Sequence, residues 1–159
     1  MNKPQDGYTL ITGASTGIGL ELAHLFAAQH TPLLLVASPR SEQTLADLAS
    51  SLQTQYGVDA RFLGVDLGQA SAADTVAAWV QSQGLQIDYL VNNAGFGICE
   101  QSIASYDAAR FAQMLQVNIN TPSLLAQHFL PAMLARRSGR VLNVSSIAGY
   151  IYPHHQQGA

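Results

Sequence analysis

The sequence predicts a doubly wound α/β fold, in which helices cover both faces of a parallel β-sheet. Apolar residues make up 48% of the 159 residues and charged residues only 11%, a balance typical of strands that are buried on both faces. Short apolar runs alternate along the chain with segments whose apolar residues recur at helical spacing. Because parallel neighbours are joined by right-handed helical crossovers, we expect five strands in the order 3-2-1-4-5.

Local patterns predict the individual elements. Short apolar runs predict strands at residues 8–12, 33–37, 62–65, 89–91 and 141–144. Amphipathic patterns predict helices directly after the glycine-rich segment 13–19, around 45–52, around 73–80 and over 107–137. We interpret residues 1–151 as a single domain and residues 152–159 as a disordered tail.

Pro122 should interrupt the long helical segment. Proline has no amide hydrogen, so it cannot bond the carbonyl of Asn118, which would be its helical partner. We therefore expect a helix break within one turn of Asn118, whose main-chain carbonyl then faces Ser146 at the end of the fifth strand and binds water. The alternative is that Pro122 simply begins a new helix, where proline is well tolerated.

Composition and charge exclude several classes of function. The net charge is −3 and no basic run exceeds Arg136-Arg137, so nucleic-acid binding has little electrostatic support. Cys99 is the only cysteine, which rules out an internal disulfide and a zinc cluster, and we expect no metal site. No signal peptide is evident, and no apolar run approaches the roughly 20 residues that span a bilayer. We expect no membrane partner and a cytoplasmic location.

A glycine-rich segment between the first strand and the first helix has the features of a phosphate-binding turn. Gly13 allows a sharp turn, Gly17 lets the backbone approach a pyrophosphate, and Gly19 lets the helix pack closely on the strand. The amides and the dipole at the start of the helix attract a diphosphate. An ordinary glycine turn is the alternative, whereas a nucleoside-triphosphate loop would end in Gly-Lys-Ser/Thr. The residues expected at the diphosphate are Gly13, Ser15, Thr16, Gly17, Ile18 and Gly19.

The spacing Gly-x-x-x-Gly-x-Gly resembles that of the short-chain dehydrogenase/reductase family. The resemblance covers about residues 8–149 and implies a Rossmann-type sheet that is incomplete here after the fifth strand. It also implies an oxidoreductase that transfers a hydride between NAD(P)(H) and a small carbonyl compound or secondary alcohol. Homo-oligomers or self-association are expected through the apolar helix at 124–134. The further matching segments are Asp66-Leu67, Asn92-Asn93-Ala94-Gly95, Asn118 and Val144 to Gly149.

The resemblance assigns roles to individual residues. Ser146 would hold the substrate oxygen, although the residue can also merely end a strand. Asn118 would hold a water in a proton relay, although an amide pointing inward from an apolar face can also be purely structural. The cofactor-binding residues that the resemblance adds are Asp66, Leu67, Asn93, Ala94 and Gly95.

The end of the second strand favours NADP(H) over NAD(H). An acidic residue there would bond the ribose hydroxyls of NAD, but the sequence has Ala37-Ser38-Pro39-Arg40 and no carboxylate before Glu42. Arg40 and Ser38 can hold a 2′-phosphate, since a guanidinium group matches phosphate geometry. The alternative is that Arg40 is only a solvated surface charge.

The catalytic Tyr-x-x-x-Lys pair that the resemblance implies is absent from the sequence. Lys3 is the only lysine and precedes every tyrosine. The pKa of a free tyrosine is about 10. General acid catalysis therefore needs a neighbouring cation that lowers this pKa, as well as the hydroxyl itself. Two interpretations stay open. In the first, the chain is the cofactor-binding portion of a short-chain oxidoreductase, and its tail reflects a truncation or a frame change. In the second, the chain is a non-catalytic cofactor-binding remnant. We expect the chain itself to be inactive.

Overall fold

The structure is a computed structural model that describes residues 7–98 and 106–146. Cys99, residues 147–149 of the serine segment and the tail at 152–159 lie outside the described residues. The strands are β1 (Tyr8–Thr12), β2 (Leu33–Ala37), β3 (Ala60–Gly64), β4 (Ile87–Asn92) and β5 (Arg140–Asn143). The helices are α1 (Gly17–Ala28), α2 (Glu42–Tyr56), α3 (Ala72–Ser82), α4 (Ala108–Leu115) and α5 (Thr121–Ala135), with a 3₁₀ turn η1 (Pro39–Ser41) and a π-helical turn η3 (Gln116–Asn120).

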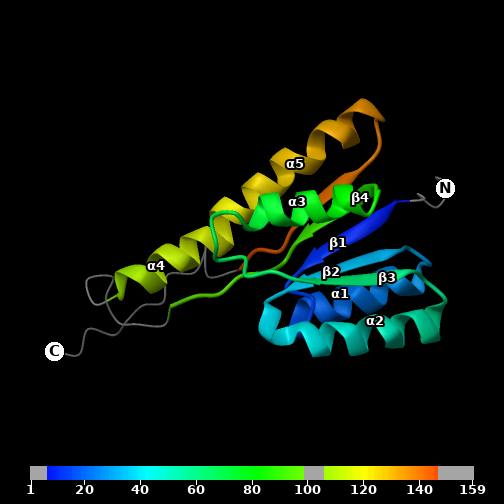
Figure 1. Ribbon diagram of the computed structural model, residues 1–159, viewed down its shortest axis with the longest axis horizontal. Coiled ribbons are helices and arrows are strands. Elements are labelled where there is room, and N and C mark those ends of the chain that lie inside the picture. The colour runs from blue at the N-terminus through cyan, green and yellow to red at the C-terminus, as the bar shows by residue number, and fades with distance from the viewer. Residues whose placement is uncertain (1–6, 99–105, 147–159) are drawn as a thin grey trace.

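The strands form one parallel sheet in the order β3-β2-β1-β4-β5, which confirms the predicted order. Helices α1 and α2 lie on one side of the sheet and α3 and α5 on the other, while α4 projects beyond it (Figure 1). The strand order reverses beside β1, because β2 and β4 lie on its two sides. Sheets of this kind bind ligands at the carboxyl ends of the strands next to that reversal.

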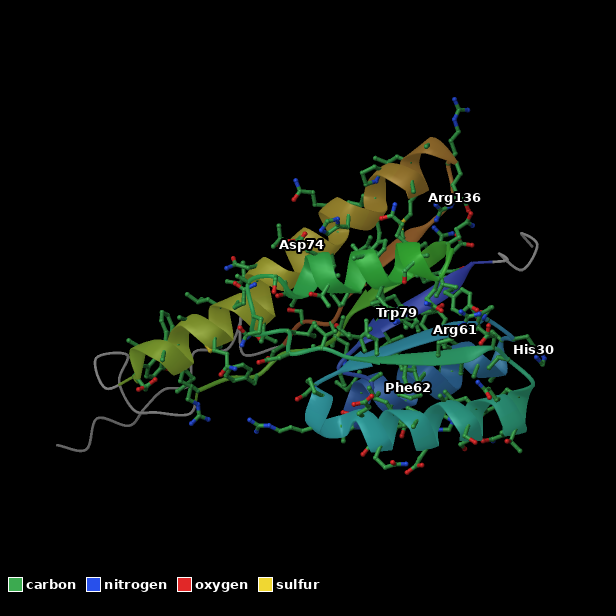
Figure 2. The ribbon with its side chains drawn as sticks, viewed as in Figure 1. His30, Arg61, Phe62, Asp74, Trp79 and Arg136 are labelled. Atoms are coloured by element: carbon green, nitrogen blue, oxygen red, sulfur yellow. The ribbon has the colours of Figure 1, made fainter. Side chains whose placement is uncertain are left out.

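The sheet separates two apolar cores. Successive side chains of a strand point to opposite faces, so Leu10 of β1 packs under α3 and α5 and its neighbour Ile11 under α1 and α2, both without exposure. Trp79 of α3 joins the first core and Phe62 of β3 the second (Figure 2). Within the described part of the chain, no helix has the length and apolar character that a membrane span requires.

A buried ion pair connects the end of α5 to the start of β4. The Asp88 side chain is 2% exposed, and Arg136 donates to its carboxylate at 2.9 Å. The Gly7 amide and the Gln86 side chain also donate to this carboxylate. Arg136 donates in addition to the Ile87 carbonyl. The charge of Asp88 is therefore compensated within the protein, as a buried carboxylate requires.

The predicted interruption near Pro122 takes the form of a π turn. The Thr121 amide donates to the Gln116 carbonyl, an i to i+5 hydrogen bond, directly before Pro122. A π turn lets a helical chain continue past a residue that lacks an amide hydrogen. Buried Thr121 also donates its hydroxyl to the Leu67 carbonyl at 2.8 Å, which joins the turn to the segment after β3. The direction of the Asn118 carbonyl stays a prediction.

Candidate functional site

The glycine-rich turn joins β1 to α1 at the carboxyl edge of the sheet. Gly13 and Gly17 have φ angles of +67° and +58°, in the left-handed region that favours glycine. A Cβ on Gly19 would collide with the Gly13 carbonyl, whereas a Cβ on Gly17 would meet open space. Thr16, the N-cap of α1, makes no side-chain hydrogen bond to the helix. The first-turn amides of α1 therefore receive no capping oxygen from it.

Thr12 and Asn93 join the ends of β1 and β4 beside this turn. Thr12 Oγ1 accepts hydrogen bonds from the Asn93 and Ala94 amides, each at 3.0 Å. The same hydroxyl donates to the Val91 carbonyl at 3.4 Å. The Asn93 side chain donates to the carbonyls of Thr12 and Gly13, at 2.9 and 3.2 Å. The Asn93 side chain therefore holds the first residues of the glycine turn against the end of β4. The sequence did not indicate this role.

A cavity of about 450 Å³ lies over these strand ends. Of the predicted cofactor-binding residues, Gly17, Gly19 and Arg40 do not line it. Sequence reasoning missed Ser41, Gln113 and Val117, which do. Because Gln113 and Val117 lie four positions apart on the predicted helix, their shared face was a signal that could have identified them. The predicted residues that line the cavity are Gly13, Ser15, Thr16, Ile18, Ser38, Asp66, Leu67, Asn93, Ala94 and Gly95.

The end of β2 presents hydroxyl groups and a cation. Ser38 and Ser41 line the cavity, and the Ser41 side chain does not cap α2. Arg40 is exposed in η1 between them. Glu42, the first carboxylate after β2, lies beside Gly64 at the end of β3 and does not line the cavity. Two hydroxyl groups therefore line the β2 end of the cavity, while Arg40 and Glu42 lie outside its lining.

Asp66 adds a carboxylate to the wall of the cavity after β3. The hydrogen bond from the Gln69 side chain lowers the pKa of Asp66, and the bond from the Gly68 amide adds to this effect. The positive charge of Arg40 lowers the pKa of Asp66 further. Asp66 is therefore ionised at neutral pH and can accept hydrogen bonds from a ligand.

Asn118 is exposed, although the sequence predicts that it points inward from an apolar face. Its Oδ1 accepts a hydrogen bond from the Phe96 amide at 3.1 Å, and its Nδ2 donates to the Phe96 carbonyl at 2.8 Å. The difference arises because α4 projects past the sheet (Figure 1), so the turn that follows faces the loop after β4. Gly95 permits this approach, since a Cβ there would lie 3.2 Å from Asn118 Oδ1.

A second cavity, of about 360 Å³, brings the π turn next to the end of β5. Its lining includes Asn92 of β4, Asn118 of the π turn and Asn143 of β5. Ser146 is exposed and lies two positions beyond Val144, which also lines this cavity. The structure therefore places the segment that leads to Ser146 beside the turn that carries Asn118.

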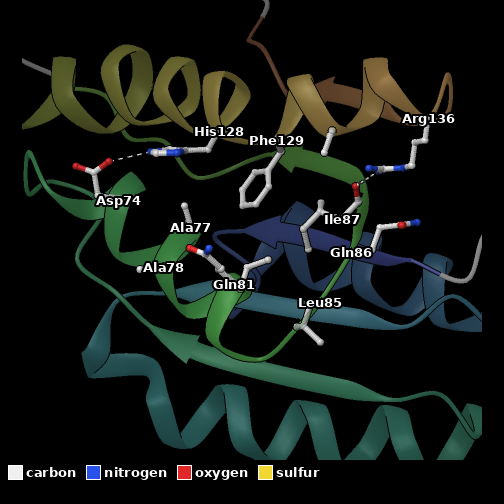
Figure 3. Close-up of a pocket in the computed structure, with 12 residues that line it drawn as sticks. Asp74, Ala77, Ala78, Gln81, Leu85, Gln86, Ile87, His128, Phe129 and Arg136 are labelled. Carbon is white, nitrogen blue, oxygen red and sulfur yellow. Dashed lines mark hydrogen bonds and ion pairs between the residues drawn. The ribbon is translucent and has the colours of Figure 1, made fainter.

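A groove between α3 and α5 is separate from both cavities. It has a volume of about 690 Å³ and extends from Asp74 and His128 to Ile87 at the amino end of β4 (Figure 3). Phe129 lines it, and so do Asp74 and His128, which share a hydrogen bond of 2.8 Å. Among residues 7–98 and 106–146, no group of three or more His, Cys, Asp or Glu side chains could hold a metal ion. None of the predicted site residues lines this groove.

A parallel sheet with a glycine turn at the reversal of its strand order defines a Rossmann-type dinucleotide-binding domain. The family model for short chain dehydrogenases matches residues 8–158. The chain therefore belongs to the short-chain dehydrogenase family, which confirms the resemblance in the sequence.

Relatives and solved structures agree with this assignment. The chain is 35% identical to the fatty acyl-CoA reductase of Acinetobacter baylyi, over 87% of this chain and 46% of that protein. L-sorbose reductase of Gluconobacter frateurii, solved with NADPH and L-sorbose, is 31% identical at a TM-score of 0.82, over 91% of this chain and 54% of that one. A short-chain dehydrogenase of Sphingobium yanoikuyae, solved with NADPH, is 28% identical at a TM-score of 0.82, over 91% and 55%. The chain spans about half the length of the curated relatives it matches.

Proposed function

We propose that this chain is the cofactor-binding portion of a short-chain oxidoreductase and prefers NADP(H) to NAD(H). The observation that carries the proposal is the cavity over the strand ends, with the glycine turn on one side and Ser38 and Ser41 on the other. The preference for NADP(H) is supported by the position of Glu42 outside this cavity and by exposed Arg40 close enough to Asp66 to affect its pKa. Two of the structural relatives were solved with NADPH.

The described residues fit a dinucleotide at this place. The turn from Gly13 to Thr16 and the start of α1 would hold the diphosphate, because their amides are directed by the glycine conformations. Asp66 and Leu67 would border the adenine, and Ser38 with Arg40 would hold the 2′-phosphate. The nicotinamide of the bound cofactor supplies or accepts a hydride. Asn118 would hold the loop after β4 in place through Phe96.

The reaction of the whole protein would interconvert a small carbonyl compound and a secondary alcohol, with Ser146 at the substrate oxygen. The names of the relatives, a fatty acyl-CoA reductase and an L-sorbose reductase, support reduction of a carbonyl group. A cofactor-binding remnant without turnover is the second candidate, favoured by the absence of a Tyr-x-x-x-Lys pair from the sequence. The coding sequence downstream of Ala159, translated in all frames, distinguishes them. A Tyr-x-x-x-Lys motif there supports the enzyme.

Replacing Arg40 is expected to weaken NADP(H) binding selectively. Arg40→Ala should cost about 1–3 kcal/mol of binding free energy for NADP(H), typical of a charge-assisted phosphate contact, and barely change NAD(H). Isothermal titration calorimetry with both cofactors measures the difference. Arg137→Ala is the matched control, because Arg137 is exposed at the far end of α5. Equal losses for both cofactors would show that Arg40 does not contact the 2′-phosphate.

The chain is also expected to self-associate through α5. Leu134 is 72% exposed and Leu130 is 38% exposed on this helix. Burying such side chains between copies removes apolar surface from water. Analytical ultracentrifugation should show an average mass that rises with concentration, and Leu134→Lys should lower it. Leu25→Lys is the control, because Leu25 is 59% exposed and lies on α1, on the other side of the sheet from α5. A monomer at every concentration would contradict this expectation.

A further inference from the structure

Gln113 is a polar residue of the cavity wall to which the family resemblance assigns no role. It lies on α4 and lines the cavity of about 450 Å³, as Val117 does one helical turn later. Gln113 and Phe96 also line a further cavity, of about 890 Å³, between α4 and the segment after β3. The Gln113 side chain therefore stands at the boundary between these two cavities.

The Gln113 side chain packs against Gly68, beside the carboxylate of Asp66. A Cβ on Gly68 would lie 2.8 Å from Gln113 Cγ and 2.9 Å from Gln113 Nε2. The same Cβ would lie 3.2 Å from Asp66 Oδ1. The φ angle of Gly68 is outside the left-handed region, so this contact uses the missing side chain of the glycine and not an unusual backbone. Gly68 thus leaves room for the Gln113 amide next to Asp66.

Asp66 and Gln113 offer complementary hydrogen-bonding groups at this end of the cavity. Asp66 Oδ1 accepts from the Gly68 amide at 3.0 Å and Oδ2 from the Gln69 side chain at 3.1 Å, and both bonds lower the pKa of Asp66. An ionised carboxylate can only accept, whereas a glutamine amide both donates and accepts. Gln113 is exposed, and its amide has no hydrogen-bond partner among the described residues. The amide is therefore available to a ligand.

Adenine has an edge that matches this pair of groups. Its 6-amino group donates, and the ring nitrogens next to that group accept. A carboxylate can take the amino donor, and a glutamine amide commonly pairs with the same edge. We propose that Gln113 is a further cofactor-binding residue, which recognises the adenine edge together with Asp66. The inference rests on the proposed function, because it requires the dinucleotide to occupy this cavity, and it adds a residue of α4 to the strand-end residues of the site.

Removing the Gln113 amide tests the contact through binding alone. Gln113→Ala should weaken NADP(H), NAD(H) and adenosine 2′,5′-bisphosphate by a similar factor, about three- to tenfold for one lost hydrogen bond, because all three contain adenine. Isothermal titration calorimetry measures the three affinities. Gln127→Ala, on a glutamine that is exposed on α5 and does not line the cavity, should change none of them. A loss confined to the two ligands with a 2′-phosphate would overturn the proposal, as would three unchanged affinities.

Gly68→Ala displaces the Gln113 side chain without removing it. In the unmodified chain the added Cβ would meet Gln113 Cγ and Nε2, so we expect weaker binding of the same three ligands. In a Gln113→Ala chain those two atoms are absent, and Gly68→Ala should cause little further loss. Equal losses in both backgrounds would show that Gly68 acts through Asp66 alone and would refute the proposal. If a thermal melt shows that Gly68→Ala does not fold, the Gln113→Ala titrations decide.

Titration of the unmodified chain separates this inference from the proposed function. A chain that binds none of the three ligands contradicts the proposed function, and this inference with it. A chain that binds them, with affinities that Gln113→Ala leaves unchanged, contradicts only the role of Gln113.

Discussion

Purified protein is expected to show no measurable reductase activity with NADPH and carbonyl substrates. General acid catalysis is worth on the order of 10² to 10⁴ in rate, and the sequence supplies neither the tyrosine nor the lysine of the pair that provides it in this family. The absorbance of NADPH in the presence of a panel of ketones and aldehydes measures the rate. Steady oxidation that survives purification and is abolished by Ser146→Ala would contradict this expectation.

Cofactor binding must be measured on the same preparation, because an unfolded chain would also be inactive. Binding of NADP(H) without turnover would support the cofactor-binding remnant. Absence of both binding and turnover, with a folded circular dichroism spectrum, would contradict the proposed function as a whole. The two measurements together therefore distinguish a chain that binds the cofactor without catalysing reduction from a chain that has no working cofactor site.

Removing Asp88 is expected to produce the largest loss of stability among the single substitutions considered. Asp88→Ala leaves the Arg136 guanidinium, whose side chain is 23% exposed, without its carboxylate, and breaking one partner of a buried pair costs about 3–5 kcal/mol. It also removes the acceptor for the Gly7 amide. Urea unfolding followed by the fluorescence of Trp79, the only tryptophan, measures the free energy of unfolding.

Asp74→Ala is the matched control for Asp88→Ala. Asp74 also pairs with a basic side chain, His128, but the Asp74 side chain is 76% exposed. Exposed pairs are strongly solvated and contribute about 1 kcal/mol or less. Similar losses for both variants would show that the Asp88 pair has no special role. An Asp88→Ala chain that does not fold at all agrees with the expectation.

The fold was predictable because each strand and the glycine turn are encoded by short, local stretches of sequence. The run from Leu33 to Ala37 is buried along its whole length, and Gly13 and Gly17 adopt the conformations that only glycine accepts easily. The strand order follows from a general crossover rule and needs no knowledge of particular contacts. Local pattern and topology therefore suffice for the architecture.

The contacts of the site were less predictable because they join residues far apart in the sequence. Nothing near Thr12 indicates that its hydroxyl accepts bonds from Asn93 and Ala94, and nothing near Asp88 indicates Arg136. The exposed position of Asn118 was missed because helical spacing assumes a regular α-helix over the sheet. The π turn and the projection of α4 change which direction that face points.

The hydrogen bonds of Thr12 have a consequence for the thermodynamics of ligand capture. They join the loop after β4 to the glycine turn, so the protein's own hydrogen bonds connect two walls of the cavity. Ordering a loop on binding normally reduces affinity through lost conformational entropy, and a preorganised cleft avoids that loss. The diphosphate end of the proposed dinucleotide should therefore bind with only a small entropic penalty from the protein.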